Sequence, residues 1–178
     1  MAIQGRFDRH QAPGFPGMIA RANEACAIDT GQAQVPSASS ARGVRPGDVV
    51  YYDSGNNGFA VPTNAAQLLL PAGIVLHDQG VVASNLTSVP SGANSNTFIQ
   101  YNDGDFIKVA SEGVVWAIVG SNVEYDDLVN WNIADSNLQL IGDPTTFASL
   151  PRRLFQVVSP NAVTSGGLAQ IRITSRVR

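Results

Sequence analysis

A turn followed by a β-branched or aromatic run occurs twice in this chain, and it constrains the fold more than any other feature. The first copy is Arg45–Tyr52 (RPGDVVYY), and the second is Asn102–Val109 (NDGDFIKV). Glycine supplies backbone conformations with positive φ, aspartate closes the turn, and the residues that follow prefer a pleated surface. The phrase therefore predicts a turn-rich β domain, and an internal duplication is one explanation of its recurrence.

Apolar runs of strand length continue from residue 47 to the end, separated by Gly, Asn and Pro. They are Asp48–Tyr52, Phe59–Val61, Gly73–Leu76, Phe98–Tyr101, Gly113–Val119, Leu138–Ile141, Leu154–Val158 and Gln170–Arg178. Helical patterns are short, the best being Val123–Asn130 and Thr145–Leu150, whereas a parallel α/β fold needs repeated crossovers of about a dozen residues. The sequence thus predicts an all-β fold over residues 45–178, a small antiparallel β-barrel or a jelly-roll-like sandwich with little helix.

Residues 1–44 are predicted to form an extended N-terminal arm. Prolines and glycines interrupt any helix between Pro13 and Gly17, and Gly31–Gly43 is mostly small and polar. Bulky side chains such as Phe7, Phe15 and Met18 nevertheless occur there, which is unusual for a free linker. A segment of this kind is typical of an arm that orders on another surface. The alternative is an arm that lies across its own domain.

Composition excludes several classes of partner and site. The net charge of -3 argues against nucleic-acid binding, which depends on a basic field. Cys26 is the only cysteine, so the chain has no intrachain disulfide and no thiolate metal cluster. No apolar stretch approaches the roughly 18 residues of a membrane span. We therefore expect a soluble chain made in a cytoplasm, without a direct nucleic-acid or membrane partner.

No set of residues predicts a catalytic, cofactor-binding or metal-binding centre. The acidic groups Glu124–Asp127 and Asp103–Asp105 lack a second ligand-rich segment and are typical of solvated turns or of a face that binds arginine. His10 and His77 are the only histidines, and no nucleophile elbow or phosphate loop is present. The chain is therefore predicted not to be an enzyme. Four aromatic residues support a sugar-binding alternative, with packing in a β core as the commoner explanation: Tyr51, Tyr52, Trp116 and Trp131.

Arginine residues near the C-terminus are the candidates for contact with an acidic protein surface. The alternation of the last strand places Arg172, Arg176 and Arg178 on one face, where guanidinium groups could pair with carboxylates. An ordinary solvated strand face is the other interpretation. Together with the bulky residues of the arm, the predicted partner-binding residues are Arg6, Phe7, Arg9, Phe15, Met18, Arg172, Arg176 and Arg178.

Several of these segments together resemble the cement, or head decoration, proteins of tailed bacteriophages. The resemblance extends to about residue 120, and the region after Val123 matches no recognisable pattern. It lies in Pro13–Ala20, Arg45–Val50, Pro71–Leu76, Tyr101–Asp105 and Glu112–Trp116.

The resemblance implies a structural role. Members of that family are small β-barrel or jelly-roll proteins that sit as symmetric oligomers on the outside of the DNA-filled head, across joints between major capsid proteins. It therefore implies a dimer or trimer bound to the major capsid protein on the outer surface of the virion, synthesised in the bacterial host cytoplasm. The alternative function is a carbohydrate-binding β module of a phage tail or fibre.

Overall fold

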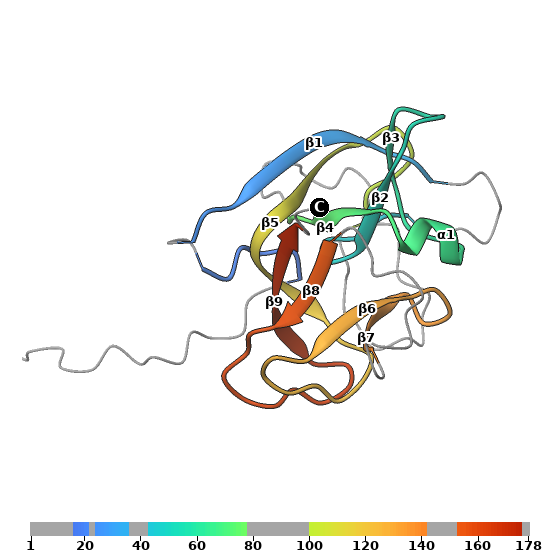
Figure 1. The fold of residues 1–178 in the computed structure, drawn as a ribbon. Helices are drawn as coiled ribbons and strands as arrows, with labels where there is room; N and C mark the ends of the chain where they lie inside the picture. The colour runs from blue at the N-terminus through green and yellow to red at the C-terminus, as the bar shows by residue number, and fades with distance from the viewer. Residues whose placement is uncertain (1–15, 22–23, 36–42, 78–99, 142–152, 176–178) are drawn as a thin grey trace, which may run out of the picture.

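The computed structural model describes residues 16–21, 24–35, 43–77, 100–141 and 153–175 (Figure 1). Within those ranges the chain forms nine strands and one short helix, α1. The all-β prediction, with little helix, is confirmed. The elements are β1 Ala27–Ala33, β2 Val49–Asp53, β3 Gly58–Ala60, α1 Ala65–Leu68, β4 Pro71–Val75, β5 Phe106–Ile118, β6 Leu128–Asn132, β7 Asn137–Leu140, β8 Arg153–Val157 and β9 Leu168–Ser175.

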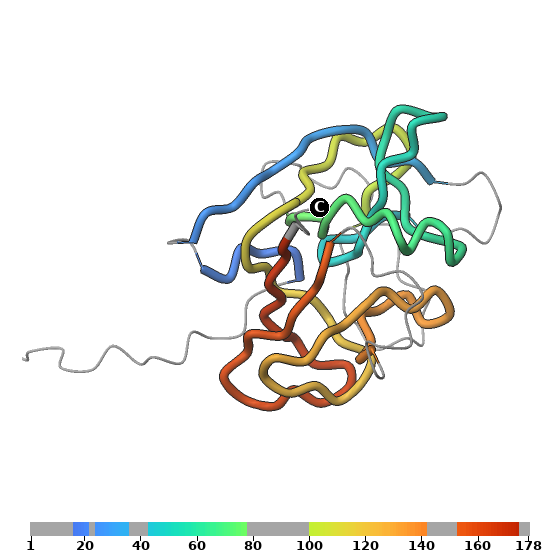
Figure 2. Tube along the Cα trace, in the orientation of Figure 1, coloured from blue at the N-terminus to red at the C-terminus, as the bar shows by residue number. Residues whose placement is uncertain are grey.

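The strands form two connected units that share β5, the longest strand. In the first unit the order is β1-β3-β2-β4-β5, and pairing between β1 and β5 closes it into a barrel. In the second unit the order is β5-β9-β8-β6-β7. The strand pairs are antiparallel except for β1 with β3, which is parallel. In Figures 1 and 2 β5 runs through the molecule from the first barrel, drawn blue to green, to the second unit, drawn orange to red.

The second unit closes in the same way as the first. In the first barrel Ala33 of β1 lies beside Phe59 of β3 in a parallel pair, and the N–H of Gln34 donates to the Phe59 carbonyl. In the second, Val119, the residue just after β5, forms a parallel bridge with Leu138 of β7. The next residue, Gly120, then donates its N–H to the Leu138 carbonyl. The two units are therefore equivalent barrels, and the second half of β5 takes the place that β1 has in the first.

Matching turns introduce the first hairpin of each barrel. The Asp48 carboxylate accepts from the Arg45 N–H at 2.8 Å before β2, and the Asp127 carboxylate accepts from the Glu124 N–H at 2.7 Å before β6. The residue before each aspartate has positive φ, 88° at Gly47 and 77° at Asp126. Each aspartate thus closes a turn by bonding to a backbone N–H three residues earlier.

The same positions line the interior of both barrels. The first interior cluster joins residues from all five strands and from two flanking bridge residues, and each member has an apolar counterpart in the second barrel. The equivalent pairs are Ala33 and Val119, Val44 and Val123, Val50 and Val129, Phe59 and Leu138, Val75 and Val157, Tyr101 and Val163, Ile107 and Ala169, and Val109 and Ile171.

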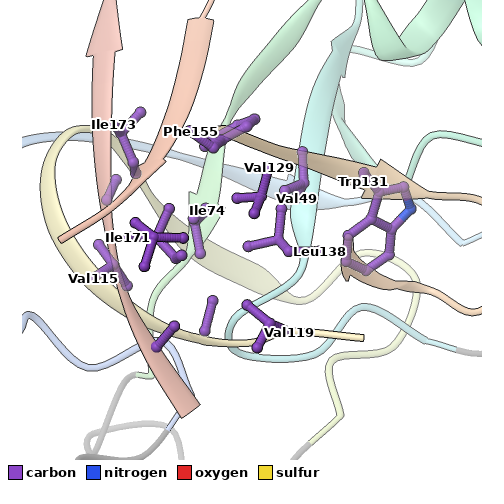
Figure 3. Packing of buried hydrophobic residues seen from close by; sticks show 14 of the residues in the cluster. Val49, Ile74, Val115, Val119, Val129, Trp131, Leu138, Phe155, Ile171 and Ile173 are labelled. Atoms are coloured by element: carbon purple, nitrogen blue, oxygen red, sulfur yellow. The ribbon is translucent and has the colours of Figure 1, made fainter. Parts of the chain in front are cut away.

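The barrels are also joined by a common core. The larger hydrophobic cluster contains Val49 and Ile74 from the first barrel together with residues that line the second. Figure 3 shows these two side chains beside Val129 and Leu138, with Phe155 packed against the same group. Because these contacts are apolar and buried, the two barrels are held as one body.

Val123–Asn130, one of the two helical candidates, forms the second barrel's entry turn and the start of β6, because Asp126 has a φ of 77°, which a right-handed helix does not allow. The other candidate, Thr145–Leu150, lies outside the described residues. The recurring phrase at residues 45 and 102 marks the turns before β2 and β5 of one barrel, while the repeated unit is the whole barrel. The boundary at residue 44 stays a prediction, although β1 precedes it and is a strand of the first barrel.

Candidate interaction surface

The segment Gly17–Ala20 lies along the second half of β5 as a short added strand. The Gly17 N–H donates to the Trp116 carbonyl at 2.7 Å, and the Trp116 N–H donates to the Met18 carbonyl at 2.9 Å. The Ala20 N–H donates to the Val114 carbonyl at 2.8 Å. Ala20 also packs against Val114 and Trp116 in a small buried cluster. Part of the predicted arm is thus bound to its own domain.

Polar contacts extend this attachment toward β9. The Arg21 guanidinium donates to the carbonyl of Val158 at 3.3 Å and to the side chain of Gln170 at 3.4 Å. Glu24 forms ion pairs with Arg21 at 2.9 Å and with Arg172 at 3.6 Å. These charged side chains are partly exposed, so each pair adds little to stability, but together they fix where the segment lies.

The structure describes two of the predicted partner-binding residues. Met18 is half-exposed on the added strand, and Arg172 lies on β9 opposite Val114 of β5, with Glu24 as its ion-pair partner. Both therefore belong to the surface where the N-terminal segment meets β5 and β9. The other predicted residues lie outside the described residues; they are Arg6, Phe7, Arg9, Phe15, Arg176 and Arg178.

An exposed apolar surface that the sequence analysis missed lies on β1 and the first half of β5. Ile28 is 45% exposed and Phe106 is 71% exposed. The register pairs Ile28 with Ala110 and Thr30 with Lys108, so Ile28, Thr30, Phe106 and Lys108 share the outer face of the first barrel. The available signal was the alternation of Phe106–Val109, which puts Phe106 on the same face as Lys108. We call this outer face, with its edge at Ile28–Thr30, the β1 surface.

The aromatic residues of the sugar-binding alternative are mostly unavailable. Trp131 is buried in the largest apolar cluster and Trp116 in the small cluster with Ala20, so neither presents a ring face to a ligand. The Tyr51 hydroxyl accepts from the Gln67 side chain, and burial, followed by the nearby Asp53 carboxylate, raises the pKa of Tyr51. Tyr52 is exposed but packs edge-on against Phe59. The four side chains do not form one stacking platform.

The acidic groups serve the turns. Asp105 accepts from the Asn102 N–H at 2.7 Å, just as Asp127 accepts from Glu124, and Asp103 accepts from the Val35 N–H at 2.9 Å. In the described ranges, no three His, Cys, Asp or Glu side chains gather where they could hold a metal ion.

A small recess of about 60 Å³ lies between Pro46 of the first barrel and Trp131 of the second. No helix in the described ranges is long and apolar enough to cross a membrane.

Cys26 should react slowly with thiol reagents in the folded protein. Burial raises the pKa of its thiol, so at pH 8 a smaller fraction is thiolate, the reactive form, than in an unfolded chain. We expect the rate of alkylation by iodoacetamide to rise on adding denaturant, as measured by mass spectrometry. Equal rates in folded and unfolded protein would contradict this reading.

Comparison with known proteins identifies the chain. The model described as "Structural cement protein (E217 gp24/Pam3 gp6)" matches residues 3–174. The chain belongs to this family of phage structural cement proteins. Within the curated proteins, no significant match to the chain is found. Among solved structures it is similar to the head fiber gp8.5 N base in bacteriophage phi29, with a TM-score of 0.47 and 16% identity over 86% of this chain and 99% of that chain.

Membership confirms the family to which the sequence motifs pointed and extends it through the C-terminal third, where no pattern was recognisable. The cement family is a family of structural phage proteins, so this member is a structural component of the phage capsid that associates with capsid proteins. The β1 surface and the N-terminal segment are the candidate contact regions.

Proposed function

We propose that this cement protein decorates the outer surface of a tailed-phage head and stabilises joints between major capsid proteins. It acts as a homo-oligomer, a dimer or trimer, without catalysis and without direct contact with nucleic acid or membrane. A ligand that binds the assembled shell better than separated subunits stabilises the shell by mass action. Many copies on one head add multivalent binding without any further chemistry.

The observation that carries this proposal is the pair of equivalent barrels fixed to each other by β5 and by a common core. A joint between two capsid subunits presents two surfaces at a set distance. A rigid body with two similar lobes can contact both surfaces at once, and little conformational entropy is lost on binding because the lobes are already held together. Family membership supports the capsid as the partner.

Heads saturated with the protein should lose their DNA at a higher temperature than undecorated heads. At a free concentration 100 times the Kd, each occupied site stabilises the bound shell by about 2.7 kcal/mol. The measurement is the fluorescence of a DNA-binding dye during heating. Binding that leaves the release temperature unchanged would contradict the stapling role.

Paired variants separate interface anchors from catalytic groups. Arg9→Ala combined with Phe15→Ala should lose most of the thermal gain, since truncating an aromatic or arginine anchor commonly costs about 2 kcal/mol or more. His10→Gln combined with His77→Gln should keep the gain, because no proton transfer is involved. The reverse pattern would call for a search for a catalytic site.

A further inference from the structure

The equivalence of the two barrels identifies a strand edge in the first barrel whose counterpart in the second is paired. In the second barrel, Gly17–Ala20 pairs with Val114–Trp116 of β5. Val114 lies opposite Arg172 of β9, and at the matching place in the first barrel Ile28 of β1 lies opposite Ala110 of β5. The segment Ile28–Thr30 is therefore the counterpart of the edge that binds the N-terminal segment.

The backbone of this edge points outward. The Leu76 N–H donates to the Lys108 carbonyl at 2.8 Å, so the backbone polar groups of Lys108 point toward the end of β4. The backbone N–H and C=O of a strand residue point to the same side. In an antiparallel sheet, a residue that bonds to the strand on one side therefore makes no backbone hydrogen bond to the residue opposite it in the strand on the other side. Thr30 lies opposite Lys108, so its N–H and C=O point away from β5. In the part of the chain that the structure describes, no strand pairs with that side of Ile28–Thr30.

The side chains of the β1 surface lack the cover that their counterparts have. Val114 is only 1% exposed beneath Ala20, whereas the equivalent Ile28 is 45% exposed. Leu168 packs partly buried against the Ala20 cluster, whereas the equivalent Phe106 is 71% exposed. Exposed apolar side chains beside an unpaired strand edge are typical of a surface that accepts an added strand.

We infer that Ile28–Thr30 binds an extended segment of the major capsid protein as an added antiparallel strand. The identity of this partner rests on the function proposed above. The added strand would pair with the backbone of Ile28 and Thr30 as Gly17–Ala20 pairs with Val114 and Trp116. Apolar side chains of the added strand would cover Ile28 and Phe106.

Two observations favour a different protein over a second copy of this chain. Each copy has one Gly17–Ala20 segment, and that segment is bound to its own β5. Asp29 is the counterpart in β1 of Val115, the residue that lies opposite Ile19. If two β1 strands paired symmetrically about this position, Asp29 would lie opposite Asp29, and like charges directly opposite are destabilising. Asp29 instead selects a strand with arginine or lysine opposite it.

A matched pair of variants tests the edge. Ile28→Lys and Leu140→Lys each replace an aliphatic strand residue of nearly equal exposure, 45% and 44%, on β1 and β7 respectively. In co-sedimentation with undecorated heads, Ile28→Lys should weaken binding about 10-fold or more, and Leu140→Lys should stay within about 2-fold of wild type. Equal binding by wild type and both variants would overturn the inference.

Hydrogen exchange tests pairing at the Ile28–Thr30 edge in the wild-type protein. The amide hydrogens of Ile28 and Thr30 should exchange more slowly on heads than in the free protein, while that of Trp116, already bonded to Met18, should be slow in both. Unchanged exchange at Thr30 on decorated heads would overturn the inference.

The outcomes separate the two proposals. If wild type fails to bind heads, the proposed function fails. If wild type binds and Ile28→Lys binds equally, only the edge inference fails. If light scattering shows that Ile28→Lys dissociates an oligomer of the free protein, the occupant is a second copy, and the capsid strand is rejected.

Discussion

Phe155→Ala should lower the free energy of unfolding by about 3–5 kcal/mol, the usual cost of removing a fully buried aromatic ring. Phe155 is 1% exposed and belongs to the core that joins the two barrels. The cavity left behind would be lined by residues of both barrels, so neither can close it by moving alone. Equilibrium unfolding in urea gives the change, provided that the slope of the transition is the same for both proteins.

The control for this variant is Phe106→Ala. This variant also removes a phenylalanine ring, but from a position in β5 where most of the ring is exposed. We expect its free energy of unfolding to stay within about 0.5 kcal/mol of wild type. If both variants lose the same stability, the ring of Phe155 is not part of a common core.

Gly73→Ala should cost about 3 kcal/mol, although it adds a single methyl group. A Cβ at Gly73 would lie 2.0 Å from the Ala110 carbonyl oxygen of β5, far inside van der Waals contact. Because the obstacle is backbone in a paired strand, β4 and β5 would have to separate and lengthen their hydrogen bonds.

A glycine in an open place provides the control for that substitution. A Cβ at Gly55 would meet only the Asp53 carboxylate at 3.3 Å, in the exposed turn between β2 and β3. Gly55→Ala should therefore change the melting temperature little, while Gly73→Ala should lower it by several degrees. Similar melting temperatures for the two variants would show that β4 and β5 separate at no cost.

Strands β2 to β5 of the first barrel could be predicted because local residues dictate them. The turns at Gly47 and Gly104 carry glycine at positive φ, followed by a β-branched or aromatic run. The repeat was hidden because the second barrel's counterpart of Gly47 is Asp126, which adopts positive φ without being glycine. Interior positions such as Phe59 and Leu138 keep apolar character but not identity, so their equivalence appears only in the pairing of strands.

The interaction surface was harder to predict for a physical reason. Most of β1 is exposed, and Ala27–Ala33 mixes small and polar residues, so its sequence predicts a short strand and turn within the arm and not a strand of the barrel. Ile28 and Phe106 are far apart in the chain, and only the register of β1 with β5 brings them to one face. The residues that would cover Ile28 and Phe106 belong to a partner in the inference above, so this chain carries no matching apolar segment that would have indicated the surface.

The shared strand restricts how the length of this chain can change in evolution. Ile107 and Val109 line the first barrel and Val115 and Ala117 contribute to the core of the second, so one inserted residue in β5 would turn one of these pairs to the opposite face. The spacing from turn to hairpin is also the same in both barrels, although their side chains differ widely. Substitutions can therefore accumulate in either barrel, whereas insertions and deletions are confined to the connections outside the strands.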